Sequence, residues 1–466
     1  MNEKEDNIKI ITGDPKKAIL KLSWPTMISM LLTMLYNIVD IIWISGLGPD
    51  YLSTMGFIMP LFLILTGFGS SLGAGANSLI ARYIGANNIK QANNAALHGI
   101  LLSIILSVIL TTILLLFMPQ ILMCLGVGNV LKYAMEYSYI VFGALFIFIF
   151  FNVASAIFRS EGDVKRATIS IAITAVLNII LDPILIYVCG WGMIGAAWAT
   201  VISVTLTSLI MAYWIWYKQD LFLDLSLKNF SFEKKMIYDE LQVAFPSFLQ
   251  TLLISGLAII INMMLVEVGG TNAVGVYSAS LNIIQLANIP LLGIGMAVLT
   301  VSGIAYGACD YENLKTTLNY SLKISFLLSL AMGVFMVVFS SQIASIFTYS
   351  DASTALAPYV SDSIKILSFY VVAIPLGLMS SMIFQGMGKG IYALIFTFLR
   401  VLVLQGIFAY IFSFVIGWGV IGIYVGLILG CFTGSVLAYI WVIIIIKRFG
   451  ENLNSNNLTS ENESVQ

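Results

Sequence analysis

Charge is scarce in this chain. Only 10% of its 466 residues are Asp, Glu, Lys or Arg, whereas 59% are hydrophobic and the mean hydropathy is +0.98. Soluble domains carry about 25% charged residues, and a water-soluble fold of this size could not cover its surface with so few. The composition therefore excludes a soluble globular protein. The net charge of −1 gives no support to a nucleic-acid partner.

Histidine and cysteine are also scarce. His98 is the single histidine, and the four cysteines stand apart at positions 124, 189, 309 and 431. There is no C-x-x-C and no H-E-x-x-H, so a metal centre and a redox motif lack their usual signatures. We therefore expect no enzyme and no cofactor.

Long apolar segments occupy most of the chain. A membrane-spanning helix needs about 20 apolar residues, and only helices or closed barrels satisfy backbone groups in lipid. The lengths indicate helices. The predicted spans are 18–46, 53–81, 95–118, 134–158, 166–188, 193–217, 241–266, 274–305, 316–341, 360–385, 391–415 and 420–446.

The positive charges predict an orientation. With the N-terminus in the cytoplasm, all of the 22 Lys and Arg residues except Lys132, Lys365 and Arg400 fall in cytoplasmic segments or adjoining helix ends. The polar N-terminus is not a cleavable signal peptide. We therefore expect a multi-pass protein of the cell membrane with both termini cytoplasmic.

The two halves of the sequence resemble each other. Trp24-Pro25 matches Phe245-Pro246, and Trp191-Gly192 matches Trp418-Gly419. These and further matches have offsets of 221 to 227 residues. Because both copies begin inside, the repeats are parallel. The sequence thus predicts an all-α membrane protein with twelve transmembrane helices in two pseudo-symmetric six-helix lobes. The predicted divisions are a cytoplasmic tail (1–17), an N-lobe (18–217), a cytoplasmic linker (218–240), a C-lobe (241–446) and a disordered tail (447–466).

At this point the chain resembles the multidrug and toxic compound extrusion (MATE) family. The resemblance rests on the two six-span repeats, the W-P opening, Asn37-Ile38-Val39-Asp40, and Asn178 with Asp182-Pro183. It is closest to the archaeal and DinF-like branch. It implies antiport, in which an inward Na⁺ or H⁺ gradient drives the export of amphipathic organic cations. The seventh-span glutamate of another branch is absent, since Ile254 stands near that place.

Acids inside the spans point to the same lobe on physical grounds. A charged side chain at mid-bilayer costs about 2.5 kcal/mol or more, so such residues face the protein interior and mark function. Asp40, Asp182 and Thr200 lie at a similar depth in three spans, and Asn178 shares the face of Asp182 one turn away. Their oxygens suit a hard cation, so we expect a cation-coupling site, with a possible Na⁺ bound by this set. The alternative to a cation site is a polar cluster whose hydrogen bonds only hold the helices together.

Other residues are weaker candidates. Side chains that could line a substrate cavity in the N-lobe are Tyr36, Asn37, Tyr137, Tyr139 and Asn152. Pro25 lacks a backbone donor early in the first span and is a candidate hinge, although a static kink is the simpler interpretation.

Two other functions compete with drug export. A lipid or lipid-linked oligosaccharide flippase of related two-lobe architecture would need a cationic cavity, and the N-lobe offers acids. A membrane-embedded enzyme would need a catalytic constellation that the sequence does not supply. We therefore expect a monomeric transporter in contact with membrane lipid, with small organic cations as cargo and H⁺ or Na⁺ as the coupling ion.

Overall fold

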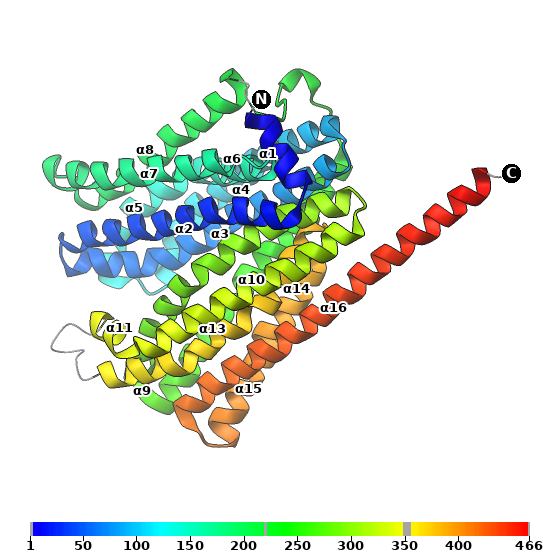
Figure 1. Cartoon of the computed structure of the whole chain (residues 1–466). Coiled ribbons are helices and arrows are strands. Elements are labelled where there is room, and N and C mark those ends of the chain that lie inside the picture. The colour runs from blue at the N-terminus through cyan, green and yellow to red at the C-terminus, as the bar shows by residue number, and fades with distance from the viewer. Residues whose placement is uncertain (1–2, 219–220, 348–355, 465–466) are drawn as a thin grey trace. The chain divides into compact units, whose positions relative to one another are not determined.

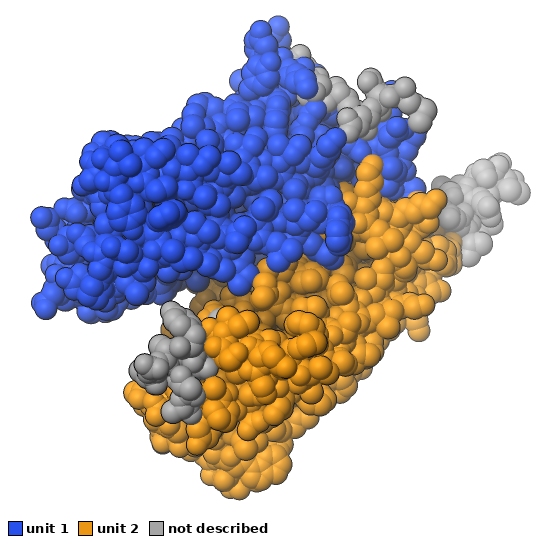
Figure 2. Space-filling view, turned by 60° about the vertical axis from the view of Figure 1, so that its left-hand side comes forward, with its two compact units in different colours: residues 1–13, 24–248 blue, residues 14–23, 249–466 orange. Residues whose placement is uncertain are grey.

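The computed structural model of the chain describes residues 3–218, 221–347 and 356–464. Helices form nearly all of these residues, and they contain no β-strand. The chain divides into two compact units (Figure 2). Unit 1 comprises residues 1–13 and 24–248, and unit 2 comprises residues 14–23 and 249–466.

The first half of the chain begins with a short helix and continues with long apolar helices (Figure 1). Its helices are α1 (Glu3–Thr12), α2 (Pro15–Ser45), α3 (Pro49–Gly85), α4 (Ile89–Cys124), α5 (Leu131–Gly143), α6 (Leu145–Ser160), α7 (Val164–Pro183) and α8 (Gly192–Ala212). Two π-helical segments, η2 (Ile184–Val188) and η3 (Tyr213–Lys218), extend α7 and α8.

The second half repeats this plan. Its helices are α9 (Lys234–Gly307), α10 (Tyr311–Val338), α11 (Ser340–Phe347), α13 (Ala357–Gly386), α14 (Gly390–Phe398), α15 (Gly406–Tyr410) and α16 (Gly419–Ser464). The π-helical segments η5 (Leu399–Gln405) and η6 (Ile411–Val415) join α14 to α15 and extend α15.

Ten described helices are long and apolar enough to span a membrane, and two irregularities bring the number of spans to twelve. Helices α5 and α6 meet at a bend of 46° and together form one span. Helix α9 contains two spans, because Gly270 breaks it with φ 68° and ψ −170°, in the left-handed region that favours glycine. With these two corrections to the ten long apolar helices, the described residues contain twelve spans. The predicted fold class is confirmed.

Helix α16 continues beyond the predicted span 420–446 and ends at Ser464. The division at residue 447 into a C-lobe and a disordered tail stays a prediction. Helix propagation adds one hydrogen bond for each residue that becomes ordered, so a helix already formed in its apolar part can extend into a polar one.

The internal duplication is visible in local geometry. Gly190 and Gly192 have positive φ values at the end of η2, and Gly417 and Gly419 have them at the end of η6. The Trp191 amide donates to the Leu185 carbonyl at 3.1 Å, and the Trp418 amide donates to the Phe412 carbonyl at the same distance. The two copies therefore share their turns and helix irregularities as well as their spans.

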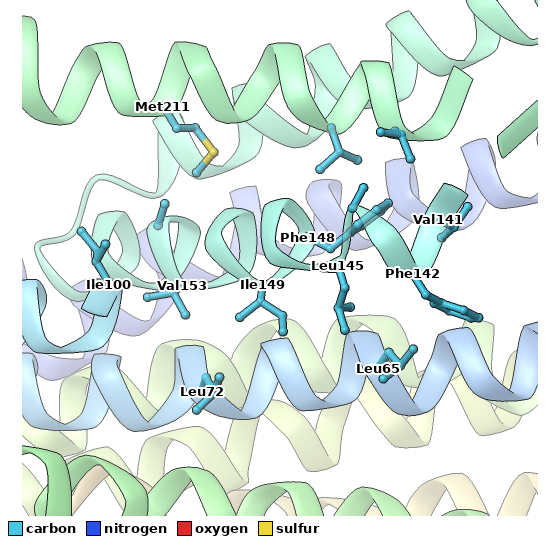
Figure 3. Close-up of a cluster of buried hydrophobic side chains, with 14 of the residues drawn as sticks. Leu65, Leu72, Ile100, Val141, Phe142, Leu145, Phe148, Ile149, Val153 and Met211 are labelled. Atoms are coloured by element: carbon cyan, nitrogen blue, oxygen red, sulfur yellow. The ribbon is translucent and has the colours of Figure 1, made fainter. Parts of the chain in front are cut away.

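Close helix packing forms the core of unit 1. Figure 3 shows Leu65 and Leu72 of α3 lying on the side that faces Leu145 and Ile149 of α6, and all four are buried. Because lipid tails are as apolar as leucine, van der Waals packing through small residues holds such helices together. At Gly73 an added Cβ would lie 3.1 Å from Ala156 Cβ.

The segment between the two halves packs on unit 1. Asn94 of α4 donates to the Ser231 carbonyl at 2.8 Å, and His98 Nε2 accepts the Glu233 amide at 3.0 Å. Glu161, which follows α6, is 2% exposed and accepts the amides of Phe222 and Leu223 at 3.0 and 3.2 Å. The segment is thus tied to the ends of α4 and α6.

Glu161 predicts a pH-dependent stability. Burial raises the pKa of its carboxyl to about 8, although the two backbone donors act in the opposite direction. Since an unfolded Glu titrates near 4.3, the folded chain binds this proton more tightly. The contribution to stability is then complete below about pH 4.3 and is lost as the pH rises to about 8. We expect Glu161→Gln to flatten the fall of the thermal unfolding midpoint between about pH 5 and 8. An unchanged slope in the variant would assign the pH dependence to other groups.

Candidate functional site

Three helices of unit 1 bring the predicted coupling residues together. Asp40 lies near the end of α2, Asn178 and Asp182 lie near the end of α7, and Thr200 lies on α8. All four are buried, with exposed fractions between 0% and 8%. The structure therefore assembles, in one unit, the four residues that sequence depth and spacing select.

Direct contacts join the four side chains. Asn178 Nδ2 donates to Asp182 Oδ1 at 3.3 Å and to Thr200 Oγ1 at 3.4 Å. The carboxyl groups of Asp40 and Asp182 contact each other. The contact links α2 to α7, while the amide links α7 to α8.

Several oxygens of this cluster have no partner. Asp40 Oδ1, Asn178 Oδ1 and Asp182 Oδ2 are buried and accept no hydrogen bond from the described residues. A buried acceptor without a donor costs about 1–3 kcal/mol, and more when it is charged. Three unsatisfied oxygens in one cluster are therefore suited to a proton or a small cation.

Proline and a π-helical turn lie directly after Asp182. Pro183 has no amide to donate to the Ile179 carbonyl, and the chain continues as the π-helix η2. Single π-helical turns are rare and frequently occur at functional sites. In the second copy η6 has the same irregularity, so the turn belongs to the shared scaffold and the acid is specific to the first copy.

The aromatic candidates divide into two groups. Tyr36 lies near Asp40, and the Tyr137 hydroxyl lies beside Thr200 and near both carboxyl groups. Tyr137 is 4% exposed, whereas Tyr139 is 40% exposed. Tyr36 and Tyr137 thus join the cluster, and no contact of Tyr139 with these residues is seen.

The two remaining cavity candidates make other contacts or none. Asn152 Nδ2 donates to the Phe148 carbonyl at 2.9 Å and packs against Gly69 of α3. Asn37 is half-buried on α2 and makes no hydrogen bond with a described side chain. Their role in a substrate cavity stays a prediction.

Pro25 is held by two hydroxyl groups. Its carbonyl accepts from Ser29 Oγ at 2.9 Å and from Thr168 Oγ1 at 3.0 Å, and the two hydroxyls contact each other at 2.9 Å. Thr168 lies on α7, so the proline position of α2 is tied to the helix that carries Asp182. The sequence alone did not identify this link.

Two further links between these helices were also missed. Thr174 Oγ1 donates to Thr207 Oγ1 at 2.9 Å between α7 and α8, and Tyr187 donates to the Trp43 carbonyl at 2.5 Å between η2 and α2. Thr174 lies one turn before Asn178, so a stripe of polar residues four apart on α7 was the available signal.

The equivalent positions of the second copy are apolar. Ile261 corresponds to Asp40 and Ala409 corresponds to Asp182, and both are fully buried. The scaffold therefore does not require acids at these places.

The chemistry of this cluster is that of a hard-cation or proton site. Its donors are carboxylate, amide and hydroxyl oxygens, which serve such ions. The described residues contain no group of three or more His, Cys, Asp or Glu side chains that could hold a metal. Twelve spans in two repeats, with acids buried in one of them, define a membrane transporter.

The comparisons with known proteins define the family. Residues 25–184 and 246–411 match MatE. The multidrug export protein MepA of Staphylococcus saprophyticus is 26% identical over 388 residues, which are 82% of this chain and 84% of that protein. The chain belongs to the MatE family, which confirms the resemblance seen in the sequence and makes it a transporter rather than an enzyme.

Solved structures agree with this assignment. A MATE protein in complex with MaL6 is 37% identical with a TM-score of 0.93, covering 96% of this chain and 99% of that one. A MOP superfamily transporter from Pyrococcus furiosus Vc1 is 37% identical with a TM-score of 0.92, covering 95% and 98%. The reverse polarity of its binding pocket is described as suggesting a different function. The archaeal and DinF-like branch stays a prediction.

Proposed function

We propose that this chain is a secondary active multidrug exporter in which the Asp40–Asp182 pair couples an inward flow of H⁺ or Na⁺ to the export of organic cations. The observation that supports this most strongly is the contact between two buried carboxyl groups from separate helices. The name of the similar protein, a multidrug export protein, gives the class of cargo.

The coupling follows from the charge of the pair. Two carboxylates in a low-dielectric interior repel each other, and desolvation also disfavours their charge. A proton shared between them relieves the repulsion, and so does Na⁺ held by Asp40, Asp182, Asn178 and Thr200. An organic cation attracted by the same negative charge then competes with the coupling ion, and the ion's arrival favours release of the drug.

Alternating access requires that each ligand bind the two conformations with different affinity. The pair lies between α2 and α7, so its occupancy acts directly on the distance between these helices. The orientation that suits export has both termini and residues 218–240 in the cytoplasm, as the positive-inside bias predicts.

A flippase for anionic lipid-linked sugars is the competing function. Such cargo needs a cationic binding surface, and the buried ionisable groups at this site of unit 1 are acids. The test is equilibrium binding to purified protein. We expect ethidium to bind, with lower affinity in Asp40→Asn, and an anionic lipid-linked sugar not to bind. Binding of the sugar without ethidium would establish the flippase.

We expect Pro25→Ala to slow drug export several-fold without loss of the folded protein. The alanine supplies the backbone donor that proline lacks, straightens α2 and shifts its contact with Thr168. The measurement is the initial rate of ethidium export from proteoliposomes. Pro60→Ala in α3 is the matched control, because it also replaces a proline inside a spanning helix. Equal initial export rates in the wild type and Pro25→Ala would mean that the kink at Pro25 is static.

A further inference from the structure

Glu240 is a fully buried carboxyl group that lies outside the Asp40–Asp182 cluster. It lies six residues after Lys234, the first residue of α9, in the part of that helix that belongs to unit 1. Its side chain is 0% exposed, and neither Oε1 nor Oε2 accepts a hydrogen bond from a described residue. A charged carboxylate in such surroundings is very unfavourable, because nothing replaces the water that it has lost.

Two glycines make room for this side chain. An added Cβ at Gly99 of α4 would lie 3.3 Å from Glu240 Oε1 and 3.7 Å from Val153 Cγ1 of α6. An added Cβ at Gly75 of α3 would lie 3.2 Å from Glu240 Cγ and 2.7 Å from the Glu240 carbonyl oxygen. The glutamate therefore lies among α3, α4 and α6, and the glycines allow α9 to approach these helices closely.

The ionisable groups of the surrounding helices do not neutralise Glu240. Arg82 of α3 donates to the Ser78 carbonyl at 3.2 Å, and His98 Nε2 of α4 accepts the Glu233 amide at 3.0 Å. Glu240 forms no ion pair with a described residue. The ionisable side chains near this end of the packed helices, none of which hydrogen-bonds to the Glu240 carboxyl, are Arg82 and Tyr83 on α3, His98 on α4, Arg159 on α6, and Glu233 and Asp239 next to it in the sequence.

The second copy of the repeat lacks this arrangement. Ile19 corresponds to Glu240 at the offset of 221 residues, and it is also 0% exposed. Ala297 and Ser321 replace the two glycines at the offset of 222 residues. One copy thus combines an acid with two glycines, and the other combines an apolar residue with two larger side chains. The scaffold therefore does not require a carboxyl group at this place.

A proton suits this place better than a metal cation does. A hard cation needs several oxygen ligands, whereas the side-chain atoms of other residues nearest to the two glycine positions are the Cβ atoms of Ala76 and Ala244 and Val153 Cγ1. A proton needs only the carboxyl group and removes the charge that burial disfavours. The path to water is short, since Glu240 lies about 9 Å along the helix from its first residue, and Lys234 is exposed.

We propose that Glu240 is a second proton-binding site of this chain, and that its ionisation loosens the start of α9 from α3 and α4. The neutral carboxyl group packs in the space that the glycines leave, and the charged group is drawn toward water. Helix α9 continues from unit 1 into unit 2 at Leu249, so the site acts on a helix that both units share. In the orientation proposed above this end of α9 is cytoplasmic. Proton binding by Glu240 does not depend on the coupling role proposed for Asp40 and Asp182.

The first test is infrared absorption of the purified full-length protein at about pH 7, where an exposed glutamate is ionised because it titrates near 4.3. We expect the wild type to show the C=O band of a protonated carboxyl group that is missing from Glu240→Gln. Glu267→Gln, which replaces an exposed glutamate of the same helix, should keep the band. Identical carboxyl spectra of the wild type and Glu240→Gln would overturn the proposal, because Glu240 would then carry no proton.

The second test is amide hydrogen exchange in the wild type alone. Opening is the ratio of exchange in residues 234–248 to exchange in residues 311–338 of α10, after correction for the intrinsic rate at each pH. We expect this ratio to rise at least ~10-fold between about pH 6 and about pH 9, because a buried charge destabilises its position by more than a tenfold change in an equilibrium requires. A ratio that stays constant would overturn the loosening of α9.

Glu240→Gln is the matched variant for the exchange experiment. Glutamine has nearly the size of the neutral acid and does not ionise, so we expect its exchange ratio to stay at the low value throughout this pH range. A rise in Glu240→Gln as large as that in the wild type would assign the opening to another group and overturn the proposal.

Discussion

Asp40→Asn and Asp182→Asn should each abolish gradient-driven drug export while leaving the protein folded in the membrane. Asparagine keeps the size of aspartate and one of its acceptor oxygens, replaces the other oxygen with an amide donor, and neither ionises nor takes up a proton. Each variant leaves a single acid, so the mutual repulsion that an arriving H⁺ or Na⁺ relieves no longer exists. We expect export rates equal to those of protein-free liposomes in both cases.

The control for this experiment is Asp50→Asn. Asp50 is an exposed acid in the first turn of α3, and its neutralisation should leave export unchanged. Both site variants should still elute from size-exclusion chromatography as the wild type does. If either variant exported drug at the wild-type rate under an imposed gradient, its acid would not belong to the coupling site.

Asn178→Leu should reduce export on the order of 10–100-fold. The Asn178 amide donates to Asp182 and to Thr200, and a hydrogen bond to a charged group contributes about 1.5–3 kcal/mol, which corresponds to this range. Leucine is branched at Cγ as asparagine is, so the variant keeps the shape of the side chain although leucine is the larger residue. The measurement is the initial export rate at saturating drug, with the apparent affinity for the coupling ion determined in parallel.

A matched variant separates this effect from loss of polarity in general. Thr205 of α8 donates only to the Val201 carbonyl of its own helix, at 2.6 Å, so Thr205→Val removes a hydroxyl without touching the cluster. We expect it to export as the wild type does. Equal impairment of Thr205→Val and Asn178→Leu would mean that the amide acts only as a general polar contact.

The fold could be predicted closely because lipid restricts the options. Backbone groups in a bilayer must be satisfied within helices, so the apolar runs alone indicated the spans. The repeat was equally visible, since Trp191-Gly192 and Trp418-Gly419 open equivalent helices. The π-helical turn after Asp182 and the left-handed break at Gly270 were not predicted, because they depend on local packing and turn geometry rather than on hydropathy.

The site could be predicted in part for a related reason. Acids within the spans are costly, and this cost alone selected Asp40 and Asp182. The contacts of Tyr137 with Thr200 and of Thr168 with Pro25 could be seen only in the structure. Tyrosine and threonine are common in this chain, and placing them in a membrane span costs far less free energy than placing a charged residue there.

The most direct test of the central claim is the export of ethidium from proteoliposomes that contain the wild-type protein alone. A pH gradient or a Na⁺ gradient is imposed separately, and a matching ionophore then collapses it. We expect at least one gradient to accelerate export well above the rate without a gradient, and its ionophore to remove the acceleration. An export rate that is the same with and without either gradient would contradict ion coupling, and with it the role assigned to Asp40 and Asp182.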